Sequence, residues 1–402
     1  MKRVYENLIE EHISKDRQMV FLSGPRQVGK TTTSLETSSE APLHYYFNWD
    51  NDNHKVLFIE GPQAIANAAK LDFLQESLPV LVFDEFHKYR NWKRFLKGFF
   101  DSYEKKCRIL VTGSARMDIY KRGGDSLMGR YFLYRLHPLS VREIADPSLP
   151  LGDIQKPKLI NETDYAALLT FGGFPEAFIK RSTTFFNQWK RLRFEQLFRE
   201  DIRDLSRVQE TSQIELLAQI LLEQASHALN HSSLAAKIRV SVPTLLRWIE
   251  LLKNLYFCFT IQPWSKNLSR ALIKEPKIYL WNWALAEDPG ARVENMIASH
   301  LYKAIQFWTD RGLGEYQLFY LRDKEKREVD FLVTKNRKPW FLVEAKASGN
   351  QGISRWLHYF QQKLEVPHAF QIGFDLPYVD QDCFSYTEPV IVPAKTFLSQ
   401  LI

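Results

Sequence analysis

A glycine-rich loop that ends in a lysine and two threonines is the first feature of this chain that points to chemistry. Two glycines let the backbone curl so that its N–H groups face phosphate oxygens at the start of a helix. Lys30 can then reach the β- and γ-phosphates of ATP, and the Thr31 hydroxyl can join the shell of a Mg²⁺ ion. The residues expected to contact this cofactor are Gly24, Pro25, Arg26, Gln27, Val28, Gly29, Lys30, Thr31 and Thr32.

An acidic pair lies where the second part of such a site is expected. The apolar run 78–83 ends in Asp84 and Glu85, and a buried parallel strand meets its ligand at its C-terminal end. Asp84 is expected to hold Mg²⁺ through water, and Glu85 to orient or deprotonate the attacking water. A third apolar run ends in Thr112 and Ser114. Either could contact the γ-phosphate, and ordinary capping of the strand end is the alternative.

A second group of acids and a lysine lies in the last third of the chain. Two strand-like runs, 327–333 and 340–346, flank a turn and predict a hairpin. The hairpin would bring Asp330 beside Glu344, with Lys346 on the same strand face because side chains repeat every two residues. Such a group could hold Mg²⁺ or Mn²⁺ and orient an attacking water. A salt-bridged surface hairpin is the alternative.

The elements that must position these groups can be placed coarsely. The run 19–22 predicts a strand before the glycine loop, and 31–37 predicts a helix after it. A Pro/Gly-rich stretch at 145–152 marks the end of the first sheet, and helical periodicity follows from about 160 to 230. The predicted domains are a P-loop domain at 1–145, a helical and winged-helix domain at 159–265, and an α/β domain at 275–402.

The segment 231–262 resembles a winged helix. Its second helix, 244–253, follows a capping serine and a first-turn proline, and 256–261 would be the wing strand. Such a helix can enter the major groove of DNA. The early exposed positions of this helix offer mainly Thr244 and Arg247 for contact with DNA. Glu250, further along the helix, would repel phosphate. A packing or lid role therefore competes with DNA binding.

Taken in order, the motifs resemble a group of bacterial and archaeal AAA-type ATPases whose C-terminal module has no known function. The resemblance implies an ATPase core with a parallel sheet. It suggests Arg130, with Arg116 as the runner-up, as an arginine that faces the phosphates or contacts another subunit. A solvated surface arginine is the alternative. The matching segments are the glycine loop, Val-Phe-Asp-Glu at 82–85, Leu-Val-Thr-Gly-Ser-Ala-Arg at 110–116, Leu-Met-Gly-Arg at 127–130 and His-Pro-Leu-Ser at 137–140.

The Asp330, Glu344 and Lys346 pattern resembles the PD-(D/E)XK nuclease superfamily, and Glu294 matches an additional helix acid of that group. This resemblance implies a restriction-endonuclease-like α/β fold. It further implies that the three acids bind a divalent metal while Lys346 steers water in phosphodiester hydrolysis. The chain departs from the AAA-type group at Asn282, where an aspartate usually follows a Pro-Lys-hydrophobic-Tyr strand.

Composition agrees with a multidomain globular chain. The 402 residues, 45% hydrophobic and 14% aromatic, favour two or three packed domains over disorder. Three scattered cysteines exclude a disulfide framework or a cysteine zinc site and fit a reducing cytosol. No membrane span or signal peptide is visible, so a cytoplasmic location is expected. The net charge of +7 is compatible with a polyanionic partner, although the basic residues are dispersed.

Three functions remain open for this α/β chain. The first is an ATPase whose nucleotide state controls a nuclease-like domain that acts on DNA or RNA. The second is an ATP-dependent switch or scaffold in which a catalytically silent nuclease-like domain binds a partner. The third is a DNA-binding regulator that uses its winged helix. A homo-oligomer or a protein partner is compatible with all three. The presence of Asp330, Glu344 and Lys346 favours the first function. The scarcity of DNA-contacting side chains on the second helix, 244–253, weighs against the third.

Overall fold

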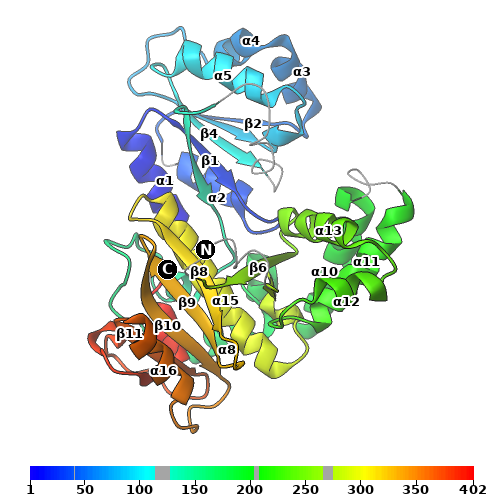
Figure 1. Cartoon of the computed structure of the whole chain (residues 1–402). Coiled ribbons are helices and arrows are strands. Elements are labelled where there is room, and N and C mark those ends of the chain that lie inside the picture. The colour runs from blue at the N-terminus through cyan, green and yellow to red at the C-terminus, as the bar shows by residue number, and fades with distance from the viewer. Residues whose placement is uncertain (40, 114–126, 203–207, 266–274) are drawn as a thin grey trace. The chain divides into compact units, whose positions relative to one another are not determined.

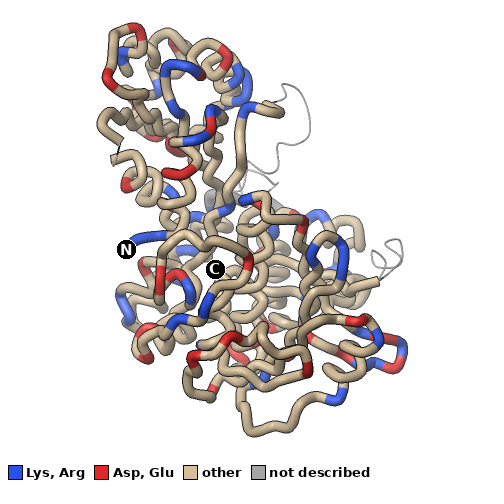
Figure 2. The backbone as a smooth tube through the Cα atoms, turned by 90° about the vertical axis from the view of Figure 1, so that its left-hand side faces the viewer, with Lys and Arg blue, Asp and Glu red and all other residues tan. Residues whose placement is uncertain are grey.

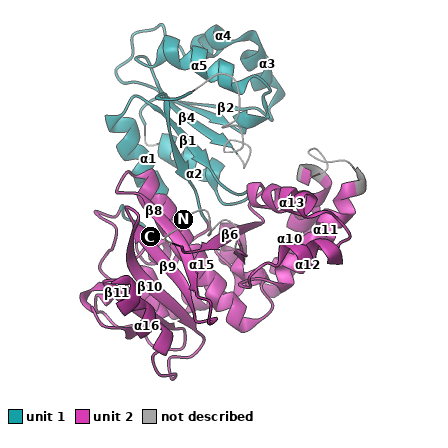
Figure 3. Cartoon of the chain, in the orientation of Figure 1, with its two compact units in different colours: residues 1–137, 147–149 teal, residues 138–146, 150–402 magenta. Residues whose placement is uncertain are grey.

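The computed structural model describes the chain except residues 40, 114–126, 203–207 and 266–274 (Figure 1). The chain divides into two compact units, 1–137 with 147–149 and 138–146 with 150–402 (Figure 3). Lys and Arg are interspersed with Asp and Glu over both units (Figure 2), as the dispersed basic residues of the sequence predict. Among the residues described, no helix has the length and apolar character needed to cross a bilayer.

Unit 1 is a five-stranded parallel sheet in the order β2-β3-β4-β1-β5, with helices on both faces (Figure 1). Its strands are β1 Met19–Ser23, β2 His44–Asn48, β3 Val80–Asp84, β4 Arg108–Gly113 and β5 Tyr131–Arg135. Its helices are α1 Val4–Lys15, α2 Lys30–Ser39, α3 Asp52–Glu60, α4 Pro62–Ala68, the 3₁₀ turn η1 Phe86–Lys88 and α5 Trp92–Tyr103. The strands predicted at 19–22, 78–83 and 108–114 and the helix at 31–37 are confirmed within two residues.

The core of unit 1 explains why β1 and β3 are continuous apolar runs. All five residues of each strand are buried, as expected for inner strands covered on both faces. Helix α5 presents a buried stripe with helical spacing, and its Phe95 and Phe99 rings pack against Phe83 of β3. This aromatic packing fixes the strand whose C-terminal end carries Asp84.

The first part of unit 2 is helical. Its elements are α7 Val141–Ala145, α8 Glu162–Phe171, α9 Pro175–Lys180, α10 Thr183–Gln196, the π-helical η2 Leu197–Ile202, α11 Val208–Glu223, α12 His231–Lys237 and α13 Val242–Asn254. Ser241 caps α13 by accepting from the Thr244 N–H, which confirms the predicted capping serine. Leu245, Trp248, Ile249 and Leu252 form the buried face of α13.

The rest of unit 2 is a seven-stranded mixed sheet in the order β12-β11-β10-β9-β8-β6-β7. Its strands are β6 Cys258–Pro263, β7 Lys277–Leu280, β8 Tyr316–Arg322, β9 Glu328–Lys335, β10 Lys338–Lys346, β11 His368–Gly373 and β12 Val390–Pro393. The helical segments are η3 Trp283–Leu285, α15 Pro289–Asp310, α16 Arg355–Leu364, η4 Cys383–Ser385 and α17 Ala394–Ser399. Helices α15 and α16 cover opposite faces of the sheet (Figure 1).

Strand β6 corrects the predicted wing. It pairs antiparallel with β7 and parallel with β8, so it belongs to the seven-stranded sheet and not to a separate winged-helix domain. The core of the middle helices also includes Cys258 of β6 and Ile278 of β7. A boundary between 265 and 275 would therefore separate hydrogen-bonded strands. Contacts between residues divide the chain into two compact units. The prediction that the chain contains three independently folding domains therefore stays a prediction.

The segment that follows β5 also packs differently from the prediction, because 138–146 belongs to unit 2. Lys303 of α15 is fully buried and anchors it. Its Nζ donates to Glu143 Oε2, to Ser140 Oγ at 3.0 Å and to Pro138 O at 3.1 Å. A buried ammonium requires such partners, so 138–146 packs with unit 2, and the domain boundary at 145 stays a prediction.

Candidate functional site

The glycine loop has the backbone that a phosphate cradle needs. Gly24 lies so close to β5 that an added Cβ would stand 2.4 Å from the Leu136 carbonyl oxygen, which excludes any side chain. Gly29 has a φ of +99°, a conformation that favours glycine. Helix α2 starts at the next residue, Lys30, so the loop N–H groups stand at a helix N-terminus.

The loop joins the acidic strand through side chains. Lys30 is buried, and its Nζ donates to Gly24 O at 3.0 Å and Pro25 O at 2.8 Å. The Thr31 hydroxyl donates to Asp84 Oδ2 at 2.9 Å, and Asp84 is itself buried. A hydroxyl and a carboxylate side by side are the oxygen donors that Mg²⁺ prefers. The structure thus brings together Thr31 and Asp84, which the sequence predicts as Mg²⁺ ligands from positions 53 residues apart.

Glu85, the predicted base, stands in an unusual backbone conformation. Its φ of +53° lies in the left-handed region, which a non-glycine residue rarely adopts and which occurs often at functional sites. Its N–H donates to Thr112 Oγ1 at 3.4 Å. Its Oε2 lies 3.4 Å from Lys88 Nζ and 3.8 Å from His87 Nε2. The carboxylate therefore lies beside the Lys88 ammonium and the His87 ring, and its role as a base stays a prediction.

The predicted hairpin is present in unit 2. Strands β9 and β10 pair antiparallel, with Val343 opposite Phe331, so the next positions outward are Asp330 and Glu344. Asp330 Oδ2 accepts a hydrogen bond from the Ala345 N–H at 2.9 Å. The two acids therefore lie at the same end of the hairpin, as expected.

Two further elements complete what we call the carboxylate cluster, defined as Lys277, Glu294, Glu328, Asp330, Glu344 and Lys346. Helix α15 supplies Glu294, whose Oε1 accepts from the Tyr279 hydroxyl at 2.8 Å. Strand β7 supplies Lys277, whose Nζ lies 3.1 Å from Glu294 Oε1 and 3.4 Å from Asp330 Oδ1. Lys277 also lies 2.7 Å from Glu328 Oε1. The sequence predicts Glu294 here, whereas Lys277 and Glu328 were not predicted.

The predicted metal site in this cluster is not formed. Over the described part of the chain, no three His, Cys, Asp or Glu side chains are arranged so that they could hold a metal ion. The oxygen donors are of the right type for a hard cation, but Lys277 already stands between Glu294 and Asp330. Glu344 accepts from Lys346 Nζ at 3.0 Å through Oε1, while its buried Oε2 has no hydrogen-bond partner among the described residues.

Burial changes the protonation of this cluster. Burial and then the carboxylate of Asp330 raise the pKa of Glu294 to about 8. The same two causes raise the pKa of Glu344 to about 7. Burial opposes the charge on Lys277, but the carboxylates of Asp330, Glu294 and Glu328 outweigh it and raise its pKa above the ordinary value. The cluster is therefore an ion-pair network in which the lysine stays charged.

Comparison with protein families identifies the first of these two sites. Residues 16–145 match a family described as an AAA domain. This range contains the whole glycine loop, the acidic strand and the parallel sheet that positions them. The match supports an AAA-type P-loop ATPase domain at residues 16–145. Residues 162–288 and 289–379 match two domains of unknown function, DUF8612 and DUF4143.

Relatives of the whole chain extend beyond the AAA-type domain. Uncharacterized proteins of Mycobacterium tuberculosis and Mycobacterium bovis are each 23% identical over 397 residues, which covers 95% of this chain and 81% of theirs. The similarity to these proteins therefore spans nearly the whole of this chain.

Three solved structures show a distant likeness to this chain. A Walker-type ATPase of Pyrococcus abyssi has a TM-score of 0.41 at 15% identity, over 70% of this chain and 93% of that chain. The Orc1 protein of Aeropyrum pernix in complex with DNA has a TM-score of 0.32 at 11% identity, over 71% and 91%. AMPPCP-bound DnaA from Aquifex aeolicus has a TM-score of 0.29 at 15% identity, over 62% and 86%. The family match, and not these distant structures, identifies the AAA-type domain.

Sequence reasoning missed two side chains that support the AAA-type site. The Tyr46 hydroxyl of β2 donates to Asp84 Oδ2 at 2.5 Å, and burial and this hydrogen bond raise the pKa of Tyr46. Arg3 is buried before α1 and donates to Val28 O at 2.9 Å and to His137 O at 2.7 Å. No local pattern could reveal Arg3, because its two partners lie 25 and 134 residues away.

The structure corrects the role predicted for Arg130 within one chain. The Met19 N–H donates to Arg130 O, so Arg130 stands at the start of β1, whereas the glycine loop follows its end. Four residues of strand, about 13 Å, separate these levels. The guanidinium instead forms a two-pronged ion pair with Asp101 at 2.7 and 3.0 Å. Arg130 therefore does not face the phosphates of its own domain. Ser114 and Arg116 lie outside the described residues.

Two other predictions concern unit 2. Arg247, the main basic group on the exposed face of α13, lies 3.1 Å from Glu210 of α11, which reduces its availability to DNA. Asn282, which stands where the resembled family has an aspartate, accepts from the Ala284 N–H and caps η3. An aspartate caps a helix in the same way, so this departure has a structural explanation.

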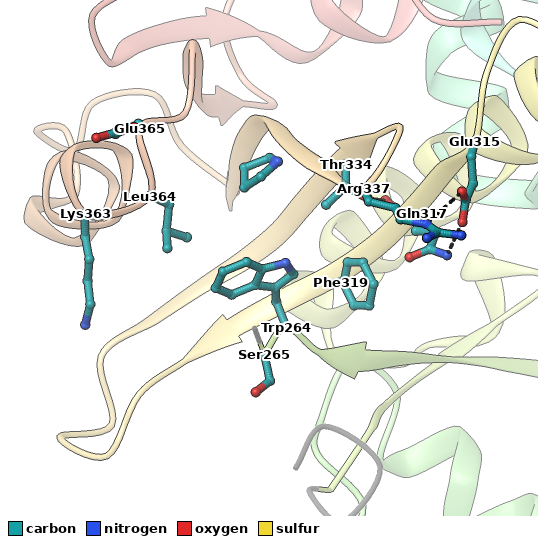
Figure 4. A pocket seen from close by; sticks show the side chains of 11 residues that line it. Trp264, Ser265, Glu315, Gln317, Phe319, Thr334, Arg337, Lys363, Leu364 and Glu365 are labelled. Carbon is teal, nitrogen blue, oxygen red and sulfur yellow. Dashed lines mark hydrogen bonds and ion pairs between the residues drawn. The ribbon is translucent and has the colours of Figure 1, made fainter. Parts of the chain in front are cut away.

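A pocket of about 730 Å³ also lies in unit 2, beside the C-terminal end of α16 (Figure 4). Trp264 and Phe319 form its apolar wall, and Arg337 at its edge pairs with Glu315. None of the carboxylate cluster lines it. The pocket is therefore separate from both groups of chemically active side chains.

Proposed function

We propose that this protein is a Mg²⁺-dependent ATPase whose nucleotide state acts as a switch on its second unit. The contact between Thr31 Oγ1 and Asp84 Oδ2 at 2.9 Å carries the proposal. The proposal is supported by the closeness of these two residues, both predicted to bind Mg²⁺, at the end of a glycine loop, and by the match of this region to an AAA domain.

Each residue then has a defined task in ATP hydrolysis. The loop N–H groups and Lys30 bind the phosphates, and Thr31 and Asp84 are the groups that would hold Mg²⁺. When bound there, Mg²⁺ would supply positive charge that offsets the charge developing on the phosphate oxygens. Glu85 orients the attacking water and accepts its proton. An arginine that compensates γ-phosphate charge would come from another subunit or be the runner-up Arg116, because Arg130 does not reach the site of its own domain.

A switch function is supported by the path of the chain. Leu136 is bonded to the strand before the loop, since its N–H donates to Ser23 O at 2.7 Å and its carbonyl lies against Gly24. Two residues later the chain belongs to unit 2, where Pro138 O and Ser140 are held by Lys303. A movement of the loop on ATP binding would therefore pull on a segment that is anchored in the second unit.

Hydrolysis by purified protein with Mg²⁺ and ATP tests the ATPase. We expect Lys30→Ala to lose nucleotide binding or turnover. We expect Glu85→Gln to bind ATP but to lose hydrolysis, because the substitution keeps the shape and removes the base. Equal turnover in wild type and Glu85→Gln would contradict the role of Glu85.

For the second unit, Lys277 in the carboxylate cluster favours a switch or scaffold with a silent nuclease-like domain over an active nuclease. Labelled single- and double-stranded DNA and RNA, incubated with Mg²⁺ or Mn²⁺, with and without ATP, separate these functions. Cleavage that Asp330→Ala abolishes, while ATP hydrolysis persists, would support the nuclease. Binding of DNA that depends on Arg247 would support a regulator that reads DNA through α13.

A further inference from the structure

Lys277 is the central cation of the carboxylate cluster. It is only 5% exposed, and its Nζ forms ion pairs with three carboxylates from two different elements, β9 and α15. The Tyr320 ring lies 5.6 Å from the same Nζ. The ammonium is thus fixed from several sides, in contrast to a surface lysine that points into solvent.

An ammonium and a divalent cation compete for the same oxygens. Carboxylates that converge on one point repel each other unless a cation lies between them. Glu294 and Asp330, two of the three acids that the sequence pattern assigns to a metal, both contact Lys277. A metal bound at ~2.0–2.6 Å from these oxygens would overlap the space of the ammonium. Only one of the two cations can be present.

We infer that Lys277 is a built-in cation that keeps the cluster closed to divalent metal, and that Mg²⁺ or Mn²⁺ enters only when Lys277 leaves. The inference rests on the proposed function, in which the nuclease-like domain is silent in this arrangement. Glu344 provides an independent observation. Its residue is 8% exposed, and its Oε2 is buried with no hydrogen-bond partner among the described residues. The cluster therefore retains a buried carboxyl oxygen that no described residue satisfies and that a metal would use.

A Mn²⁺ titration of the full chain without nucleotide tests this inference. Free Mn²⁺ is followed by electron paramagnetic resonance, and thermal unfolding is measured at each concentration. We expect Lys277→Met to gain one Mn²⁺ site at least about tenfold tighter than any site in the wild-type cluster. Its Tm should rise with Mn²⁺, because the ion binds the folded state.

Two control variants locate the site. Asp330→Asn in the Lys277→Met background should remove the gain, which separates cluster binding from binding at the P-loop. Lys346→Met removes the other ammonium, which pairs with Glu344 at 3.0 Å. It should change Mn²⁺ affinity less than Lys277→Met, because Lys277 pairs with three carboxylates.

A charge-compensated variant covers the case in which Lys277→Met does not fold. Lys277→Met with Glu328→Gln removes one cation and one anion together, and should also bind Mn²⁺ more tightly than wild type. The inference is overturned if neither variant exceeds wild type, or if wild type already binds Mn²⁺ as tightly in an Asp330-dependent manner. ATP hydrolysis is measured in parallel. Its absence would overturn the proposed ATPase and leave the Mn²⁺ result unchanged.

Discussion

The glycine loop and the carboxylate cluster both place a buried lysine beside acids, but they hold that lysine differently. Lys30 donates to two main-chain carbonyls, whereas Lys277 forms ion pairs with three carboxylates. A carbonyl is neutral, so an arriving phosphate competes well for Lys30. Ionised carboxylates attract an ammonium more strongly than neutral carbonyls do, so Lys277 leaves only if another cation replaces it. The first arrangement suits ligand binding, and the second suits a closed network.

The largest expected effect contrasts one acid from each region. Asp84→Asn should lower ATP turnover by about 100-fold or more, because it weakens the Mg²⁺ site at the charge that develops in the transition state. The same chemical change in the cluster, Asp330→Asn, should leave turnover within about twofold, since Asp330 belongs to the other unit and is not one of the residues assigned to the ATP site. Steady-state phosphate release measures both. Equal losses in the two variants would mean that the regions work as a single site.

The free energy of unfolding should depend strongly on the carboxylate cluster, in contrast to ATP turnover. In buffer free of divalent ions, Lys277→Met should destabilise the second unit by about 3 kcal/mol or more, because it leaves buried carboxylates without their cation. Lys346→Met should cost about 1 kcal/mol or less, because Lys346 is partly exposed. Denaturant unfolding measures the two values. Similar losses for both lysines would contradict the central position of Lys277.

The protonation of Glu344 provides a smaller, pH-dependent test. Folding raises its pKa from an ordinary 4.5 to about 7, so between these values the folded chain holds a proton that the unfolded chain has released. Stability contributed by this group therefore falls as pH rises through that interval. Glu344→Gln cannot ionise, and it should be more stable than wild type at pH 8 by about 3 kcal/mol. The gain should vanish below about pH 4. Parallel pH profiles for the two proteins would contradict the shift.

Arg130 should show the smallest effect within one chain. Because its guanidinium pairs with Asp101 at the far end of β1, Arg130→Ala should change ATP affinity and turnover per isolated chain by about twofold or less. A larger loss that depends on protein concentration would place this arginine at a neighbouring subunit. Recovery of turnover on mixing Lys30→Ala and Arg130→Ala chains would establish that arrangement.

Much of both sites was predictable from sequence because their signals are local. The spacing from Gly24 to Thr31, the apolar run that ends in Asp84 and the hairpin that carries Asp330 and Glu344 each follow from short-range patterns. Glycine conformation, burial of a continuous apolar run and the two-residue repeat of a strand act within a few residues. The structure confirms all three.

Only the tertiary structure decided which distant groups meet these residues. Tyr46 contacts Asp84 because β2 and β3 are neighbours in the sheet. Lys277 contacts Asp330 although their strands, β7 and β9, are not adjacent in the seven-stranded sheet. Strand order likewise places Arg130 at the far end of β1. Sequence alone shows the type of each side chain and its local element. Whether an acid faces a metal, a phosphate or a lysine depends on sheet order and helix packing, which join residues far apart in the chain.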